Sequence, residues 1–328
     1  MRLLQVSPVR EAWNPFSASC FRSCHRWADM GRRGATGLAG ILPVDKPSGM
    51  TSHDVVARIR RMTGEGRVGH AGTLDPMATG LLVILVGPYT RLEPYLSSAE
   101  KAYEATIAFG SATDTDDAEG TVVRTGALRP ELLDTAFAAD TLSNLLGPSQ
   151  QRPPAYSAIK VGGEVAHRAA RAGAPLELAE RAIEVFSAEL LGIDAENAAW
   201  HVRFCVSKGT YIRALARDLG EMVGVPAHLA ALRRTASGTL RIEDAVTLDE
   251  SADITTRFVD PVLALGLVAV EVDPALIANG SALPRDTASQ IPDETDVAIV
   301  SEGALLAIYR TTPRQLAPRV VLPPRSPA

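Results

Sequence analysis

Residues 67–82 read RVGHAGTLDPMATGLL and place a carboxylate, an imidazole and three glycines in one short segment. Asp75 precedes Pro76, a position that disfavours the α region and favours an extended or turn conformation. The apolar run 81–86 (LLVILV) predicts a buried strand directly after it. Three glycines allow sharp turns or close backbone approach because they lack a Cβ: Gly69, Gly72 and Gly80. The segment therefore predicts a bent loop that presents the Asp75 carboxylate beside a core strand.

Two interpretations of this loop are open from its residues alone. Asp-Pro pairs are ordinary turn initiators, and a lone loop histidine such as His70 is usually structural. Spacing alone favours that structural turn. A carboxylate on a glycine-bent loop anchored by a core strand is also the geometry expected for positioned chemistry.

The residues upstream predict the start of the folded unit. Residues 40–49 (GILPVDKPSG) form a short apolar segment that ends in a Pro/Gly turn. Thr51 or Ser52 can cap a helix that stops at Gly64. The apolar positions of this helix fall on one face: Val55, Val56, Ile59 and Met62. Lys46, taken alone, is typical of a surface lysine.

Downstream of the loop, apolar and polar residues alternate over 101–109 and predict a strand with one buried face. Tyr103 within it is, taken alone, typical of a core aromatic residue. The acidic run 112–120 (ATDTDDAEG) is not an EF-hand loop, because an alanine and a glutamate stand where an oxygen ligand and a glycine are required. A helix is predicted from about Pro130 to Leu146.

Two further segments carry chemistry-bearing residues. Residues 147–175 combine proline, aromatic and basic side chains and predict a mobile nucleic-acid clamp, although a solvated loop has a similar composition. An alternating strand over 200–206 leads to a helix that Thr210 can cap and Gly224 can end. Arg213 is placed near the start of this helix, facing away from its apolar side. That apolar side is predicted to hold Ile212, Leu215, Leu219, Met222 and Val223.

The two ends of the chain differ from its middle. Residues 1–37 are Arg-rich and acid-poor, and they are interpreted as a disordered extension or a misassigned start in preference to a transit peptide. Cys20, Cys24 and His25 lack a second ligand pair at zinc-site spacing and are interpreted as incidental. Residues 255–328 hold short β-like runs separated by proline, glycine and acidic segments, which predicts a small all-β unit.

Composition places the 328-residue chain among ordinary soluble globular proteins, with 46% hydrophobic and 22% charged residues. No run approaches the ~18 apolar residues of a membrane-spanning helix. Three cysteines are too few for a disulfide framework and fit a reducing cytosol. The net charge of -5 argues against nonspecific coating of nucleic acid, yet residues 203–234 carry six basic side chains against two acidic ones. A cytoplasmic monomer without membrane association is expected.

Residues 67–82 are very similar to the signature G-H-x-G-x-L-D-P-x-A-x-G-x-L of the bacterial tRNA pseudouridine-55 synthases, the TruB family, at every signature position. Seven segments resemble the family in all, in the family's order. The other six are D-K-P-x-G-x-T-S at 45–52, K-x-Y-x-A at 101–105, T-D-T-x-D-x-x-G at 113–120, Q-x-P-P-x-Y-S-A at 151–158, S-K-G-T-Y-I-R at 207–213 and L-R-R at 232–234. The resemblance covers residues 40–240 and extends only loosely to the tail.

The resemblance implies an α+β fold. Residues 38–250 would form a pseudouridine synthase catalytic domain with a mixed, mainly antiparallel sheet and flanking helices, including the clamp at 147–175. Residues 255–328 would form a small all-β, PUA-like domain. The implied reaction converts uridine 55 in the T-loop of tRNA to pseudouridine by base flipping and aspartate-dependent C–N cleavage and C–C rejoining, with the tRNA T-arm as partner and with no cofactor or metal.

The resemblance also implies a catalytic set and a substrate-binding set. In the first, a carboxylate pairs with an arginine and a tyrosine lies against the target base: Asp75, Arg213 and Tyr103. In the second, a wedge, two pocket walls and two lysines contact the RNA: His70, Tyr211, Leu232, Lys46 and Lys208. An aromatic or apolar wall suits a base that has left its stack.

Two other functions are compatible with parts of the sequence. A tRNA-binding or tRNA-folding module without catalysis would keep the basic face but would not need Asp75 paired with Arg213. A metal-dependent hydrolase could use His70, Asp75 and the cluster 114–117, and would lose activity with a chelator. The sequence lacks a second well-spaced histidine for such a metal site.

Overall fold

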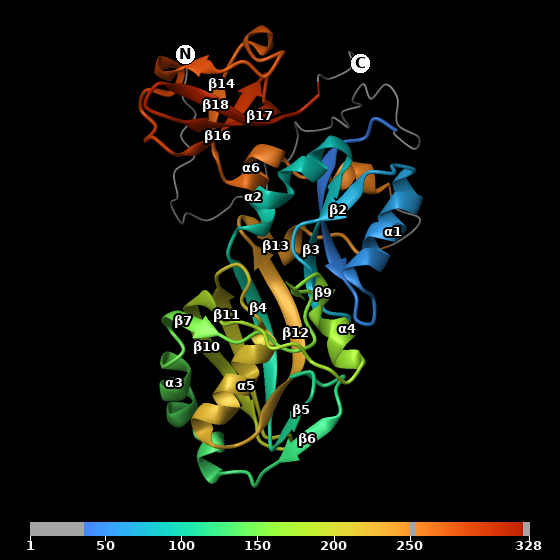
Figure 1. Cartoon of the computed structure of the whole chain (residues 1–328), viewed down its shortest axis with the longest axis vertical. Helices are drawn as coiled ribbons and strands as arrows, with labels where there is room; N and C mark the ends of the chain where they lie inside the picture. Colours follow the sequence, from blue (N-terminus) through green and yellow to red (C-terminus); the bar gives the residue numbers. More distant parts are fainter. Residues whose placement is uncertain (1–35, 249–252, 324–328) are drawn as a thin grey trace.

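A long mixed sheet forms the body of the molecule (Figure 1). The computed structural model describes residues 36–248 and 253–323, so Cys20, Cys24, His25 and nearly all of the predicted extension lie outside it. Within the described residues the sheet has nine strands, seven of them in one row. The row runs β1 (Gly40–Lys46), β3 (Thr79–Val86), β12 (Ala227–Ser237), β4 (Lys101–Phe109), β11 (Ala199–Val206), β10 (Arg181–Asp194), β7 (Gly147–Gln151); β2 (Val68–His70) pairs with β3 and β13 (Leu240–Arg241) with β12.

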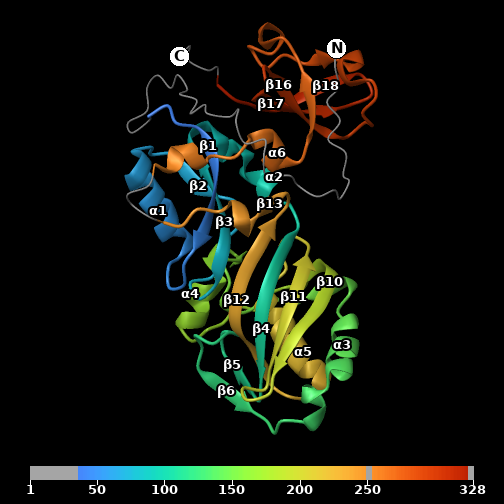
Figure 2. The ribbon, with the colours of Figure 1, turned by 180° about the vertical axis from the view of Figure 1, so that it is seen from behind.

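Helices cover one face of the β12–β4–β11–β10 part of this sheet and leave the other open. Figure 1 shows α5 and α3 in front of the strands, and Figure 2 shows the uncovered face. The helices are α1 (Ser52–Thr63), α2 (Glu93–Ser97), α3 (Thr135–Ser143), α4 (Ala166–Arg171), α5 (Ile212–Val223) and α6 (Pro261–Leu265). Two hairpins, β5 (Ser111–Thr113) with β6 (Val122–Thr125) and β8 (Lys160–Val161) with β9 (Glu164–Val165), lie beside the sheet. No helix among the described residues is long and apolar enough to cross a membrane.

Most of the helices and strands predicted from local sequence patterns are confirmed. Helix α1 begins after Thr51, whose hydroxyl accepts from the Asp54 amide in a reciprocal capping box, and it ends at Gly64 in the left-handed conformation. Strand β4 buries every second residue as its alternation predicts. The strand after the Asp75 loop is buried from Gly80 to Val86. These elements follow local patterns because neighbouring residues supply their caps and their apolar faces.

Three local predictions are wrong in detail. The helix predicted over 130–146 is broken at Asp134, whose extended backbone and carboxylate cap α3, so that only a 3₁₀ turn precedes it. Thr210 does not cap α5, because its hydroxyl donates to the Ser207 carbonyl instead. Met222 is 51% exposed and does not belong to the apolar side of α5.

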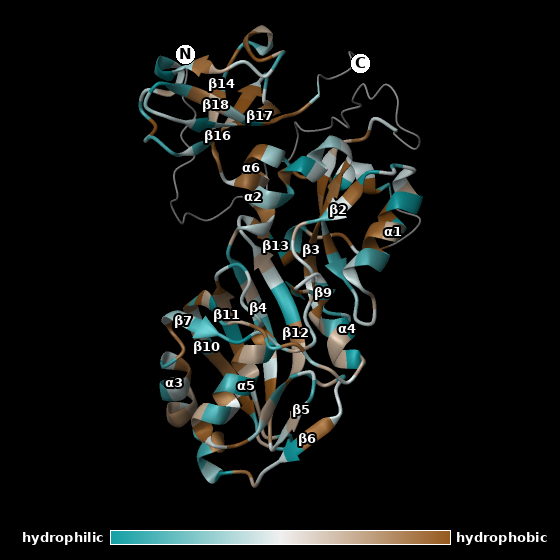
Figure 3. Ribbon diagram, in the orientation of Figure 1, coloured by the Kyte–Doolittle hydropathy of each residue, from teal (hydrophilic) through white to brown (hydrophobic). Residues whose placement is uncertain are grey.

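Strand β12 joins the two halves of the sheet, and Figure 3 shows a hydrophilic stretch within it. It pairs with β3 in parallel over just two residue pairs, Thr79 with Arg233 and Gly80 with Arg234. Gly80 has φ +98°, and a Cβ there would lie 2.3 Å from the Arg234 carbonyl oxygen. This glycine is therefore what allows the two strands to meet.

Substitution Gly80→Ala is expected to destabilise the protein by about 3 kcal/mol or more, because the new methyl group collides with backbone as well as adopting an unfavourable φ. Gly163→Ala is the matched control, since Gly163 also has positive φ (+89°) but has open space around it; it should cost about 1 kcal/mol. Chemical denaturation of both variants tests this. Equal losses of stability in the two variants would show that the collision with the Arg234 backbone does not contribute.

A second sheet lies at the C-terminal end, in the order β14 (Val268–Glu271), β16 (Asp296–Ser301), β17 (Ala304–Thr311), β18 (Gln315–Val321), β15 (Leu283–Pro284). These strands lie where the sequence predicts short β-like runs. One face packs on the first sheet through a shared apolar cluster that includes Ile41, Leu81, Leu305 and Ile308. The expected α+β architecture, a mainly antiparallel sheet with helices plus a small β-rich unit, is thus observed.

Candidate active site

The Asp75 loop connects β2 to β3 and is tied to its surroundings along its length. The Ser52 hydroxyl donates to the Leu74 carbonyl at 3.1 Å and accepts from the Leu74 amide at 2.9 Å. The Ala78 amide donates to the Asp75 carbonyl. Gly72 and Gly80 adopt positive φ as sharp turns require, whereas Gly69 does not. The side chain of Asp75 remains 35% exposed, so a fixed loop presents its carboxylate to solvent.

Arg213, at the start of α5, holds this carboxylate with two nitrogens. Its Nε lies 2.9 Å from Asp75 Oδ2, and its Nη2 donates to Asp75 Oδ1 at 3.3 Å. The guanidinium is 5% exposed and also donates to the carbonyls of Thr115 and Tyr156, each at 3.0 Å. Arg213 is therefore buried against the loop, and not a surface residue. The two-point contact fixes the orientation of the Asp75 carboxylate.

Asp117 is a second carboxylate on the same guanidinium, a pairing that the sequence does not indicate. Its Oδ2 lies 3.4 Å from Arg213 Nη1, and its side chain is 6% exposed. The Thr115 hydroxyl and the Glu119 amide donate to its Oδ1 at 2.6 and 3.1 Å. The sequence excludes an EF-hand in this acidic run and offers the cluster 114–117 only to a metal-dependent hydrolase. The signal available was the alternation of threonine and aspartate, which favours local side-chain hydrogen bonds.

Lys46 is not at the surface, so that expectation is wrong. It is fully buried, and its Nζ donates to the carbonyls of Pro47, Met50 and Pro76 at 2.9, 2.7 and 3.1 Å. Burial lowers the pKa of Lys46, and nearby Asp75 opposes this shift. Because Pro76 follows the exposed aspartate, Lys46 braces the loop from beneath.

Arg234 braces the other end of the loop and was also missed as a functional candidate. It is 1% exposed, and its guanidinium donates to the carbonyls of Gly72, Thr73 and Leu81. Lys101 lies close by, and burial lowers the pKa of Lys101 to about 8, with repulsion from Arg234 acting in the same direction. Buried cations therefore hold the carbonyl groups on both sides of Asp75.

Three residues predicted to contact the target base are Tyr103 on β4, Leu232 on β12 and Tyr211 before α5. Tyr103 and Leu232 are 8% exposed and belong to one apolar cluster with Leu74 and Ala78 of the loop. Tyr211 stands just before α5, two residues from the arginine that holds Asp75. Tyr103 and Leu232 thus pack with the loop from β4 and β12, and Tyr211 adjoins the helix start that carries Arg213.

Gln151 fixes the backbone of Tyr211 and is a further residue that the sequence analysis missed. Its amide nitrogen donates to the Tyr211 carbonyl at 3.1 Å, and its amide oxygen accepts from the Tyr211 amide at 2.9 Å. Gln151 is 1% exposed and ends β7. The sequence gives no sign of this contact, because sixty residues separate the two partners.

His70 and Lys208 lie at the margin of the site. His70 ends β2, and its ring lies 5.7 Å from the ring of His53 in an edge-on arrangement. Burial is the main cause that lowers the pKa of His70, and the nearby His53 acts in the same direction, which favours the neutral imidazole. Lys208 is exposed in the turn between β11 and α5.

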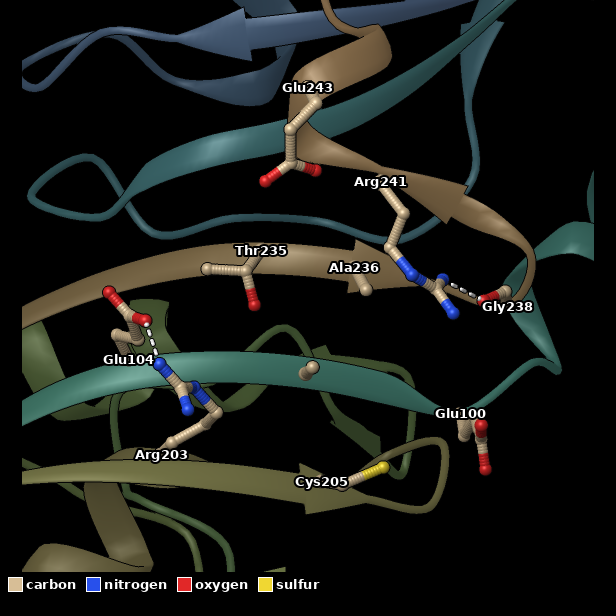
Figure 4. Close-up of a pocket in the computed structure, with 10 residues that line it drawn as sticks. Glu100, Glu104, Arg203, Cys205, Thr235, Ala236, Gly238, Arg241 and Glu243 are labelled. Carbon is tan, nitrogen blue, oxygen red and sulfur yellow. Dashed lines mark hydrogen bonds and ion pairs between the residues drawn. The ribbon is translucent and has the colours of Figure 1, made fainter. Parts of the chain in front are cut away.

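No group of three or more His, Cys, Asp or Glu side chains in residues 36–248 and 253–323 is arranged to hold a metal ion. His70 contacts His53, and the oxygens of Asp75 and Asp117 face Arg213. A hollow of 330 Å³ lies on the opposite face of the sheet, lined by Glu104, Arg203 and other residues shown in Figure 4. It is separate from the Asp75 site, because Glu104 and Tyr103 point to opposite faces of β4.

Comparison with known proteins defines the class. Residues 60–212 match the model of the TruB family pseudouridylate synthase N-terminal domain, and residues 213–262 match that of the tRNA pseudouridylate synthase B C-terminal domain. A solved chain from a structure titled "Crystal Structure of a Cbf5-Nop10-Gar1 Complex" superposes with a TM-score of 0.65 at 25% identity, covering 87% of this chain and 84% of that one. The fold is that of the pseudouridine synthases.

Curated relatives place the chain more narrowly. It is 51% identical over 220 residues to tRNA pseudouridine synthase B of Thermobifida fusca, covering 65% of this chain and 74% of the relative. It is 42% identical over 292 residues to the protein of that name from Mycobacterium sp. (strain KMS), covering 87% and 96%. The chain belongs to the TruB family of pseudouridylate synthases, which confirms the resemblance found in the sequence.

Proposed function

We propose that this chain is a tRNA pseudouridine synthase that isomerises uridine 55 in the T-loop of tRNA. The observation that carries the proposal is the Asp75 carboxylate, which is partly exposed on a braced loop and held at both oxygens by the buried Arg213. A non-catalytic module would have no need of so constrained a carboxylate. Membership of the TruB family supports the same activity.

The reaction requires what this site supplies. The C1′–N1 glycosidic bond breaks, the uracil rotates, a bond forms from C1′ to C5, and the proton on C5 is lost while N1 gains one. No electron or phosphoryl group is transferred. A carboxylate can act as a nucleophile in such chemistry or stabilise charge that develops at the anomeric carbon. Asp75 is the group placed to do so.

The target base must leave its stack and enter a pocket. In our proposal Tyr103 lies against the base, Tyr211 and Leu232 form pocket walls, and His70 fills the space that the base vacates. The burial of Tyr103 and Leu232 beside the loop supports this arrangement. Lys208 contributes a phosphate contact, whereas the buried Lys46 acts by bracing the loop.

The remaining assignments complete the proposal. Residues 38–250 act as the catalytic unit and 255–328 as a second, β-rich unit. The T-arm is the part of tRNA bound, by a monomer in the cytoplasm. Residues 147–175 act as the RNA clamp; they contain β7, the hairpin β8–β9 and α4, and the last two carry the basic residues Lys160, His167, Arg168 and Arg171.

Unmodified tRNA transcript incubated with the protein in EDTA should acquire pseudouridine at one T-loop uridine, mapped by carbodiimide treatment and primer extension. A transcript with cytidine at that position should stay unmodified and is the control. Tight tRNA binding without modification would favour the folding module instead. Activity that disappears in EDTA and returns with a divalent metal ion would favour the hydrolase.

A further inference from the structure

Arg181 lies beside Tyr211, one of the proposed pocket walls, and has no role in the site described so far. It begins β10, directly opposite Gln151 on β7. Gln151 in turn holds the backbone of Tyr211. The Arg181 guanidinium carbon lies 5.9 Å from the centre of the Tyr211 ring, a cation–π arrangement. Its Nη1 also comes within 3.5 Å of where a Cβ on Gly209 would stand.

The guanidinium of Arg181 differs from those of neighbouring arginines in its hydrogen bonding. Within the described part of the chain, no carboxylate or carbonyl accepts from it, although a guanidinium carries five donors. Arginines on neighbouring strands differ. Arg203 on β11 pairs with Glu104 and Glu189, and Arg233 on β12 pairs with Asp45. An arginine held in place by a ring, with its donors unused, is preorganised for an anion that arrives with a ligand.

Other positive groups surround the same place. The exposed Lys208 precedes Gly209 in the turn that Arg181 approaches. Helix α5 begins immediately after Tyr211 with no side-chain cap, so the positive end of its dipole is not neutralised locally. The guanidinium, the ammonium and the helix start therefore all favour negative charge beside Tyr211.

We propose that Arg181 is a positioning residue that binds an RNA backbone phosphate next to the base held by Tyr211. A phosphodiester offers the oxygens that a guanidinium fork matches. Contact at this point would hold the strand while the base lies against the tyrosine. This inference rests on the proposed function for the identity of the RNA, but phosphate binding itself is measurable without turnover.

Salt dependence of binding tests the proposal directly. A tRNA T-arm hairpin is titrated with wild type, Arg181→Met and Arg181→Lys at several salt concentrations. Loss of one phosphate contact should raise Kd roughly tenfold at low salt. It should reduce the slope of log K against log salt by about 0.7 to 0.9. Arg181→Lys should keep the slope and recover part of the affinity, because it retains the charge.

Arg203→Met is the matched control. Arg203 is also a strand arginine, but it lies on the opposite face of the sheet and is paired with Glu104, as Figure 4 shows. Its removal should leave both Kd and the salt slope unchanged. An unchanged slope for Arg181→Met, with thermal stability equal to wild type, would overturn the proposal.

A second measurement locates the phosphate. Hairpins in which single phosphates near the target uridine are replaced by neutral methylphosphonates are bound to wild type and to Arg181→Met. One replacement should weaken wild type and leave Arg181→Met unaffected, which shows that both changes remove the same contact. If every replacement weakens both proteins equally, the contact does not exist.

Rates separate this inference from the proposed function. At saturating hairpin, single-turnover pseudouridine formation by Arg181→Met should stay within about threefold of wild type, as expected for a residue that acts in binding. A wild-type protein that binds the hairpin but forms no pseudouridine would refute the proposed function. The slope of log K against log salt would still decide whether Arg181 binds a phosphate. A large rate loss with unchanged Kd would refute the binding role of Arg181.

Discussion

Asp75→Asn is expected to reduce the rate of pseudouridine formation on the order of 10⁴-fold or more, because the amide can neither act as a nucleophile nor stabilise cationic character at the sugar. The substitution keeps the shape of the side chain. Arg213 keeps its contacts with Asp117, Thr115 and Tyr156. The loop should therefore remain in place, and tRNA binding should stay within a few-fold of wild type.

Single-turnover kinetics at saturating tRNA, together with a filter-binding Kd, measure the two expectations separately. Asp140→Asn is the control, since Asp140 is an exposed carboxylate on α3 far from the loop in sequence and its change should leave both values unaltered. A rate for Asp75→Asn within tenfold of wild type would exclude Asp75 as the catalytic group. It would leave the braced loop without a chemical role.

The second large effect is expected from Arg213→Lys. Lysine keeps the positive charge but has a single nitrogen, so it cannot contact both oxygens of Asp75 and also reach Asp117. The Asp75 carboxylate should then lose its fixed orientation, and misplacement by about 1 Å can cost on the order of 10²-fold in rate. The Kd for tRNA should change little, since Arg213 is buried and does not face the RNA.

Arg217→Lys is the matched control on the same helix. Arg217 also contacts two carboxylates, those of Asp116 and Asp218, but not Asp75. Its substitution should leave the single-turnover rate within a few-fold of wild type. Thermal melts of both variants distinguish lost geometry from lost folding. Equal rate losses in the two variants would show that helix stability, and not carboxylate orientation, is what matters.

Local elements of this fold are predictable because the residues that specify them are neighbours. The capping box of α1 lies within four residues, Thr51 to Asp54, and the alternation of β4 records one buried face. The Asp75 loop is likewise marked by its own glycines and proline. A resemblance to a family then links this loop to Arg213, which spacing alone cannot do.

The supporting residues were missed because polarity in a sequence normally indicates exposure. Lys46 and Arg234 are nonetheless buried, since carbonyl groups from the distant loop accept their hydrogen bonds. The sequence does not reveal the role of Asp117 either, because its partner Arg213 lies on the distant helix α5. Arg181 gives no sequence signal, since its neighbour Tyr211 meets it only across the folded sheet. Such long-range pairings have no local pattern.

The position of β12 between β3 and β4 has a consequence for synthesis on the ribosome. Both neighbours emerge before residues 227–237, so the central gap in the sheet stays open until late. Until then β4 presents an unpaired edge along its length, and the carbonyls of Gly72 and Thr73 lack Arg234. A chain released early would therefore be inactive and prone to aggregate, and RNA modification begins only once translation has passed the strand that closes the sheet.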